Sequence, residues 1–487
     1  MARPPRFDSN RPPPIPPNHT MPPATPSSAR LPTPSARQLA WHSLEAYGFV
    51  HFTVNTFTDK EWGYGDESPA DFQPTDFDAD QIAESAADGG LAGLILTCKH
   101  HDGFCLWPSR YTEHSVRNSP WRNGEGDVVR ELSEACARRH IRFGVYLSPW
   151  DRNHPAYGFP EYIETYRNQL RELLTEYGPL FEVWFDGANG GDGYYGGARE
   201  TRTIDKATYY RWHETWRLVR ELQPDACIFS DAGPDIRWVG NEQGFAGDPC
   251  WATYDRAQCV PGEVNGADLT TGTRHAADWC PAECDVSIRP GWFYHAREDD
   301  HVRSPENLLD LFFRSVGRGG ALNLNLPPDR RGRIHDRDAA SLRQFRRRID
   351  ALFADNLANR ARIQADGGPR PAPANVAPDL LVDGRRDSYW ATSDDATPVN
   401  FTLTFPNPVT VSVLELREHL PLGQRIDEFT LDAASATGEW RNVLAATAVG
   451  NRRLLRFFPV TSDRFRLRIT RSQAPPALAA LGLYRGE

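Results

Sequence analysis

The chain has 487 residues and carries 55 Lys and Arg against 65 Asp and Glu, which gives a formal net charge of -10. This acidic balance argues against a nucleic acid partner, because phosphate binding requires clustered basic side chains. No apolar run approaches the roughly 18 residues that a membrane span needs, so we expect no membrane span. The length suits one large α/β barrel with a smaller second domain.

Residues 1–35 are rich in Pro, Ser and Arg and show no periodic apolar pattern. Such a segment cannot bury enough apolar surface to offset the entropy of ordering, so we expect it to be disordered. It also lacks the apolar core of a secretory signal. A cytoplasmic location is therefore expected, with export as the alternative if the true N-terminus differs.

Residues 36–360 alternate between short apolar runs and amphipathic segments whose apolar residues recur every three or four positions. This alternation is typical of repeated βα units and predicts a (β/α)8 TIM-like barrel. An open doubly wound sheet is the alternative, but no glycine fingerprint follows the first strand. The predicted strands are 48–53, 93–97, 142–147, 182–185, 226–229 and 322–326, and the predicted helices are 127–139, 161–176, 206–222 and 305–316.

A stretch rich in Pro and Ala at 367–378 separates this pattern from a different one. Beyond it, short segments of alternating apolar and polar residues occur at 400–405, 410–416, 428–431 and 464–469. Such segments predict a C-terminal antiparallel β-sandwich over residues 370–487.

The eight cysteines are scattered along the chain rather than arranged as a disulfide framework, so most should be reduced and buried. Cys280 and Cys284 have the spacing of half a metal site, but no second Cys or His pair with ligand spacing accompanies them. We therefore expect neither a metal nor another cofactor.

Five side chains capable of chemistry follow directly after the predicted strands. They are His51, His100, His101, Tyr146 and Asp186. Because the carboxyl ends of barrel strands all open on one face, these side chains should meet at one mouth of the barrel.

Asp186 follows the apolar strand in FEVWFDGANGG and precedes a glycine-rich turn. Hydrolysis of a glycosidic bond needs one carboxylate at the anomeric carbon and one carboxylic acid that protonates the leaving oxygen, and Asp186 is a candidate for the first role. Trp184 lies two residues earlier on the same strand face and would line the same cavity. A helix N-cap or turn residue is the alternative role for Asp186.

Two further segments carry hydrogen-bonding side chains. KHHDGFCLWPS places His100 and His101 at a strand end, where two imidazoles can bond neighbouring sugar hydroxyls. Packed histidines or half of a metal site are the alternatives, and no third ligand at helical or hairpin spacing supports the metal. HFTVNTFTDKEWGYGDE adds His51, Glu61 and Trp62, which combine polar groups with an aromatic face, although Glu61 taken alone is a solvated loop acid.

Together these segments resemble the α-L-fucosidases of glycoside hydrolase family 29, which are retaining enzymes built on a (β/α)8 barrel. The resemblance covers about residues 37–357 and is carried by KHHDGF, GVYLSPWDRN, EVWFDGANG and LNLPPDRRG. It implies hydrolysis of terminal α-linked L-fucose by double displacement, with Asp186 as the nucleophile. The expected substrate-binding residues are His51, Glu61, Trp62, His100, His101, Tyr146, Trp184 and Trp292.

The general acid/base is expected in RWVGNEQG, which resembles the stretch that carries this residue in the subgroup acting on branched α-1,3/1,4-linked fucose. The resemblance makes Glu242 the proton donor. CPAECDVSIRPGWFYH also resembles that subgroup and makes Trp292 a wall of the leaving-group subsite. The competing acids are Asp248, Glu263, Glu283 and Asp285.

The sequence departs from the usual family pattern at Thr53, in HFT where HFG is commoner, and at Cys98, where Ala is common. The side chain of Thr53 would crowd the floor of the cavity. The C-terminal segment around Trp390 resembles discoidin-type or carbohydrate-binding β-sandwiches, in which such residues either bind sugar or are structural. A metal-dependent hydrolase that uses the His pair and a non-catalytic sugar-binding protein are the alternative functions. The expected partner is a fucosylated oligosaccharide or glycoconjugate.

Overall fold

The computed structural model of the chain describes residues 31–257, 259–264, 268–366, 377–392 and 398–486. Most of the segment predicted to be disordered, residues 1–30, lies outside the described residues. The first helix, α1 (Ala36–His42), begins where Ser35 and Gln38 form a capping box.

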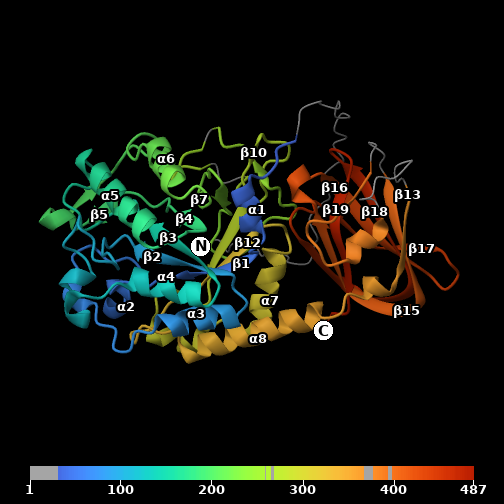
Figure 1. Cartoon of the computed structure of the whole chain (residues 1–487), viewed down its shortest axis with the longest axis horizontal. Coiled ribbons are helices and arrows are strands. Elements are labelled where there is room, and N and C mark those ends of the chain that lie inside the picture. The colour runs from blue at the N-terminus through green and yellow to red at the C-terminus, as the bar shows by residue number, and fades with distance from the viewer. Residues whose placement is uncertain (1–30, 258, 265–267, 367–376, 393–397, 487) are drawn as a thin grey trace, which may run out of the picture. The chain divides into compact units, whose positions relative to one another are not determined.

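Eight parallel strands close into a barrel, as predicted (Figure 1). Around the barrel the strand order is β1-β12-β11-β8-β7-β4-β3-β2. All its strands are short and almost entirely buried, which is why they appear in the sequence as brief apolar runs. Their bounds are β1 (Ala46–Val50), β2 (Gly93–Lys99), β3 (Arg142–Leu147), β4 (Glu182–Trp184), β7 (Cys227–Ser230), β8 (Ile236–Trp238), β11 (Ala282–Ser287) and β12 (Ala321–Asn325).

Amphipathic helices cover the outside of this barrel, each turning its apolar stripe inward. Figure 1 shows α3, α4 and α8 beside one another on this outer surface, and the contacts among them agree. No helix in the described ranges is long and apolar enough to cross a membrane. The remaining helices are α2 (Val54–Thr58), α3 (Ala79–Asp88), α4 (Val128–Arg138), α5 (Glu161–Glu176), α6 (Trp212–Leu222), α7 (Pro305–Arg314) and α8 (Asp336–Phe353).

The barrel departs from eight regular βα repeats on one side. Strands β7 and β8 are joined by a short turn, and the described part of residues 239–281 contains a two-stranded antiparallel ribbon but no helix. The ribbon consists of β9 (Thr253–Tyr254) and β10 (Asp278–Trp279). A second small ribbon, β5 (Gly191–Gly193) with β6 (Glu200–Arg202), follows β4. Long loops without helices therefore lie beside the barrel mouth.

The C-terminal part is the predicted β-sandwich-type domain, an antiparallel sheet of seven strands with its own apolar core. Two of the predicted segments, 400–405 and 410–416, belong to one strand interrupted by register shifts. Trp390 is 1% exposed and packs edge-on against Phe401, so its indole belongs to the core. The strands are β13 (Arg362–Asp366), β14 (Trp390–Ala391), β15 (Val399–Glu418), β16 (Ile426–Ala434), β17 (Trp440–Thr447), β18 (Arg453–Ser472) and β19 (Ala477–Tyr484).

A cluster of ion pairs joins the turn before β1 to this sheet. Glu45 pairs with Arg386, Arg417 and Arg452, and its side chain is only 12% exposed. Burial alone would raise the pKa of Glu45, but the three guanidinium groups, led by that of Arg417, hold the pKa well below its ordinary value. The ionised carboxylate therefore stabilises the folded chain.

We predict that Glu45→Gln lowers the free energy of unfolding by about 3 kcal/mol at neutral pH, because it removes the carboxylate that Arg386, Arg417 and Arg452 share and leaves Glu415 alone to balance the buried Arg417 and Arg452. Since the folded-state pKa is depressed, this stabilisation is present above the ordinary pKa of 4.5 and is lost as the pH falls below it. Urea unfolding followed by circular dichroism at pH 7 and pH 4 measures the difference. Glu84→Gln, which breaks an exposed pair with Arg139, is the control and should cost at most about 1 kcal/mol. Equal effects of the two substitutions would contradict the prediction.

Candidate active site

Asp186 lies directly after β4, at the carboxyl end of the barrel strands. The hydroxyl of Tyr146 donates to its Oδ2 at 2.9 Å, and the backbone N–H of Ala188 donates to its Oδ1 at 2.7 Å. The bond from Ala188 is a local turn bond, but no helix begins here, so the alternative of a helix N-cap is wrong. One carboxylate oxygen is thus fixed by the turn and the other faces Tyr146.

Burial raises the pKa of Asp186, while the bonds from Ala188 and Tyr146 lower it. Gly187 is required next to it, because a Cβ there would lie 1.9 Å from Oδ2 of Asp231. Burial, together with the nearby Asp186, raises the pKa of Asp231 to about 6. Asp231 follows β7, the strand next to β4, and no local pattern in the sequence marks it as a site residue.

The three predicted histidines also meet at this end of the barrel. The ring of His100 lies 4.1 Å from that of His101 and 5.5 Å from that of His51, measured between centroids. Burial lowers the pKa of His51 and of His101 to about 3, and that of His100 well below its ordinary value. All three imidazoles are therefore neutral at physiological pH.

The hydrogen bonds of His51 and His101 determine which ring nitrogen carries the proton. His51 Nδ1 lies 2.8 Å from Oδ1 of Asn325, an amide that donates through Nδ2 to the carbonyl of Trp292. His101 Nδ1 lies 2.7 Å from Oγ of Ser148, which donates its own proton to the carbonyl of Trp150. Both Nδ1 atoms must donate, so both Nε2 atoms are acceptors for hydroxyl groups. His101 Nε2 lies 3.9 Å from Oδ2 of Asp186.

Lys99 is a buried cation whose role the sequence does not predict. Its ammonium bonds Asp151 at 3.0 Å, Tyr162 at 3.1 Å and Gln169 at 3.0 Å. These bonds anchor the end of β2 from which the histidine pair emerges. Lys99 is therefore a structural residue of this site.

Glu61 is not a solvated loop acid. Its two oxygens accept from the backbone N–H groups of Trp292 at 2.8 Å and Phe293 at 3.1 Å, and from the ring of His295. The indole of Trp62, by contrast, is 54% exposed and meets the ring of His101 edge-on. Glu61 thus fastens the loop after β11 to the loop after β1.

Trp292 packs against His51, with ring centroids 5.2 Å apart, and its indole N–H donates to Glu242 at 3.2 Å. Glu242 is exposed, in the loop after β8. The loop after β8, which carries Glu242, therefore lies against the loop after β11, which carries Trp292.

The competing acids occupy other environments. Asp248 pairs with Arg453 of β18. Glu283 accepts from the indole of Trp184 at 2.8 Å inside the barrel, where burial raises its pKa. Burial also raises the pKa of Asp285, followed by the charges of Glu283 and Glu242. Glu263 lies in the described part of the loop between β9 and β10.

Thr53 does not crowd this site as the sequence suggested. Its hydroxyl donates to Oδ2 of Asp102 at 2.8 Å and accepts from the backbone N–H of Asn55, which caps α2. Among the described residues, no group of three or more His, Cys, Asp or Glu is placed to hold a metal ion. The side chains gathered here, neutral imidazoles with a tyrosine, indoles and a carboxylate, suit an uncharged polyhydroxyl ligand with an apolar side.

The comparison with known families agrees with this chemistry. The family described as Alpha-L-fucosidase matches residues 33–348. The chain belongs to the α-L-fucosidases of glycoside hydrolase family 29. The sequence-based assignment of the family and of an enzyme is thereby confirmed.

Similar fucosidases extend over nearly the whole chain. Alpha-L-fucosidase 1 of Arabidopsis thaliana is 43% identical over 457 residues, which are 93% of this chain and 88% of that protein. A family 29 glycoside hydrolase from an unknown rumen bacterium is 42% identical with a TM-score of 0.84, covering 94% of this chain and 78% of the other. A Ruminococcus gnavus family 29 fucosidase in complex with fucose is 29% identical with a TM-score of 0.83, covering 96% and 97%.

In this fucosidase we predict that Tyr146→Phe shifts the acidic limb of the kcat/KM profile to higher pH. The hydroxyl of Tyr146 lowers the pKa of Asp186, so its loss raises that pKa further, and any activity that needs the ionised carboxylate should disappear at a higher pH. The plateau should fall about tenfold to hundredfold, as expected for a lost bond to a charged group. An aryl fucoside assay from pH 4 to 8 measures both effects.

Tyr166→Phe is the matched control, because the buried hydroxyl of Tyr166 donates to the carbonyl of Leu147 at 3.0 Å instead. Its acidic limb should stay in place. A limb that does not move in Tyr146→Phe, or moves equally in both variants, would count against Asp186 as the titrating group.

Proposed function

We propose that this fucosidase hydrolyses terminal α-linked L-fucose with retention, using Asp186 as nucleophile and Glu242 as general acid/base. The observation that carries the proposal is the carboxylate of Asp186, held by Tyr146 and Ala188 at the barrel mouth beside three neutral imidazoles. An Asp→Ala mutant of the Ruminococcus gnavus fucosidase was crystallised with fucose. A pocket that binds fucose without one aspartate fits a role for such a residue in the reaction.

The reaction would run in two displacements. In the first, Asp186 attacks the anomeric carbon while Glu242 gives its proton to the leaving oxygen, so that a fucosyl ester forms and the acceptor sugar departs. In the second, Glu242 takes a proton from water, the water oxygen attacks the anomeric carbon, and Asp186 leaves as a carboxylate. For these roles the two carboxyl groups should approach to about 5–5.5 Å when substrate is bound.

The imidazoles would bind the sugar rather than transfer protons. His51 and His101 offer Nε2 lone pairs to hydroxyl protons, and their pKa values of about 3 keep them neutral in the working range. Trp184 would supply the apolar contact for the C6 methyl group of a deoxy sugar. Neutral acceptors near Asp186 leave its negative charge uncompensated until positive charge develops at the anomeric carbon.

We predict that Asp186→Ala abolishes fucoside hydrolysis and that azide restores turnover by entering the space left by the carboxylate. The product to measure is fucosyl azide, by mass spectrometry and NMR, with an aryl fucoside as donor. Azide should form the β-anomer, since it attacks from the face that Asp186 occupied. Near-native activity in Asp186→Ala would contradict the assignment of Asp186 as the nucleophile.

The acid/base assignment is tested by the pair Glu242→Gln and Glu263→Gln. Glu242→Gln should slow hydrolysis of substrates with poor leaving groups far more than that of an activated aryl fucoside, because only the former need protonation. Glu263→Gln should behave like the wild type. The reverse pattern would transfer the role to Glu263.

We further propose a preference for α-1,3/1,4-linked fucose on branched acceptors. The support is the resemblance of RWVGNEQG and DVSIRPGWFYH to the branched-linkage subgroup, and the bond between the Trp292 indole and Glu242. Binding energy from the sugars beyond fucose would be used to order this pair of loops, so substrates without those sugars should lose turnover as well as affinity.

Accordingly, Trp292→Ala should lower kcat/KM for a Lewis-type trisaccharide about tenfold more than for an aryl fucoside, because the indole is the expected stacking surface for the acceptor. Trp292→Phe keeps a ring but removes the N–H bond to Glu242, and so separates stacking from the placement of the acid. Wild-type kcat/KM for the trisaccharide, an α-1,2-fucosyl disaccharide and an aryl fucoside sets the reference. Equal or greater efficiency on the last two would refute the linkage preference and leave fucosidase activity intact.

A further inference from the structure

His295 is a buried histidine next to the active site, and it lies between two carboxyl groups. It follows β11 and is 1% exposed. Its Nδ1 lies 2.6 Å from Oδ1 of Asp59, and its Nε2 lies 2.7 Å from Oε1 of Glu61. The imidazole therefore bridges two carboxyl groups of the turn that follows α2.

The carboxyl groups of Asp59 and Glu61 determine the protonation state of the His295 ring. Ionised carboxylates only accept hydrogen bonds, so a ring with a carboxylate at each nitrogen must donate from both. An imidazole with two N–H groups is an imidazolium. The bond from His295, with the charge of Arg297, lowers the pKa of Asp59, so the outer partner is ionised.

Glu61, the partner nearer the active site, also holds the loop that carries Trp292. Besides the ring of His295, Glu61 accepts from the N–H groups of Trp292 and Phe293, so one carboxylate fixes three residues of the loop. Trp292 in turn bonds Glu242 and packs on His51. The fit is tight, because a Cβ on Gly291 would lie 2.5 Å from Oε1 of Glu61.

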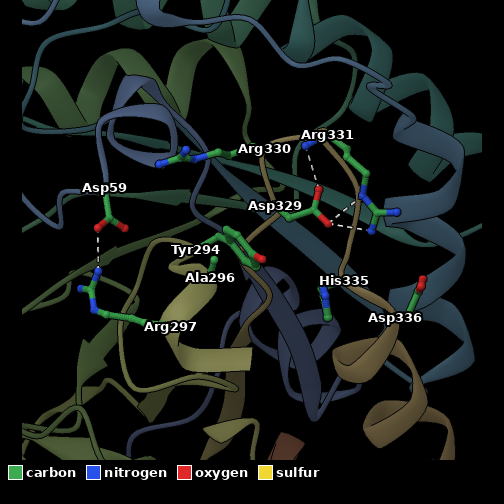
Figure 2. A pocket seen from close by; sticks show the side chains of 9 residues that line it. All are labelled: Asp59, Tyr294, Ala296, Arg297, Asp329, Arg330, Arg331, His335 and Asp336. Carbon is green, nitrogen blue, oxygen red and sulfur yellow. Dashed lines mark hydrogen bonds and ion pairs between the residues drawn. The ribbon is translucent and has the colours of Figure 1, made fainter. Parts of the chain in front are cut away.

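The outer end of the bridge reaches a cavity of about 490 Å³. Figure 2 shows Asp59 paired with Arg297 on one side of this cavity and Asp329 paired with Arg331 on the other. The arginines of the LNLPPDRRG motif thus line this cavity, which otherwise has no part in the proposed reaction. Protons can reach the bridge through the exposed half of Asp59, whose side chain is 47% exposed.

We propose that His295 is a positioning residue: as an imidazolium clamped between Asp59 and Glu61, it holds Glu61 and the Trp292 loop in the arrangement that turnover requires. Loss of its proton removes one of the two N–H bonds and loosens the clamp, so activity falls on the alkaline side. The charged groups around the ring are Asp59 and Glu61 from the segment after α2, Arg297 and Glu298 from the turn after the loop, and Arg330 from the segment after β12.

The inference rests on the proposed fucosidase function. Fucosyl fluoride is the substrate that separates the role of His295 from proton donation by Glu242. Fluoride leaves without protonation, so the first displacement needs no proton from Glu242. The wild-type kcat/KM for fucosyl fluoride should still fall at alkaline pH. His295→Gln, which can donate but cannot titrate, should lower the plateau about tenfold and flatten that limb.

Asp59→Asn keeps His295, Glu61 and the residues expected to bind the sugar. It should move the alkaline limb of the kcat/KM profile to lower pH, because the imidazolium of His295 loses one of its two carboxylate partners. Arg331→Gln, which alters the cavity without touching the bridge, should leave the limb in place. An alkaline limb absent from the wild type, or unmoved in Asp59→Asn, overturns the inference while fucosidase activity stands.

A second readout does not depend on turnover. NMR of protein labelled with ¹⁵N-histidine should show one ring with both nitrogens protonated at neutral pH, and this signal should vanish in His295→Gln. A single protonated nitrogen for that ring would overturn the proposal even if no fucoside were hydrolysed. Thermal unfolding of the variants confirms that they fold.

Discussion

One buried carboxyl group ties four strands of the barrel together. Glu283 of β11 accepts from Trp184 of β4 at 2.8 Å and from Asn323 of β12 at 3.0 Å, and Tyr47 of β1 also donates to it. A fully buried carboxyl group without such donors would be strongly destabilising, so the strands must meet in this one arrangement. Trp184 lies two residues before Asp186, and the bonds to Glu283 therefore also set the position of Asp186, the proposed nucleophile.

The active site divides between rigid strands and loops. The groups around Asp186 come from strand ends, and their rings pack on one another. The ring centroids of Tyr146 and Trp184, for example, are 5.1 Å apart. Glu242 comes from the long connection between β8 and β11, whose described part has no helix, and Trp292 comes from the loop between β11 and α7. In the proposed function, groups built on the barrel would bind fucose, and the sugars beyond fucose would meet the loop that Glu61 and His295 hold.

Sequence reasoning predicted the strands that are continuous apolar runs, because burial on both faces leaves that pattern. It missed β8, which has only three residues, and β11, where AECDVS carries Glu283 and Asp285 into the interior. Charged residues facing the inside of a barrel do not resemble a strand in a single sequence. Taken alone, Glu61 resembles a solvated loop acid for a related reason, since its partners are backbone groups more than two hundred residues away. His295 and Lys99 likewise depend on long-range contacts that no local pattern reveals.

The central claim is that Asp186 forms a covalent bond to the sugar. A 2-deoxy-2-fluoro fucosyl fluoride reacts quickly in the first displacement and slowly in the second, so it traps the ester. Proteolysis and mass spectrometry of the trapped enzyme should place one fluorofucosyl group on the peptide that contains Asp186. A label on Glu61, Asp231 or Glu242, or a first-formed product of inverted configuration with no label at all, would contradict the account.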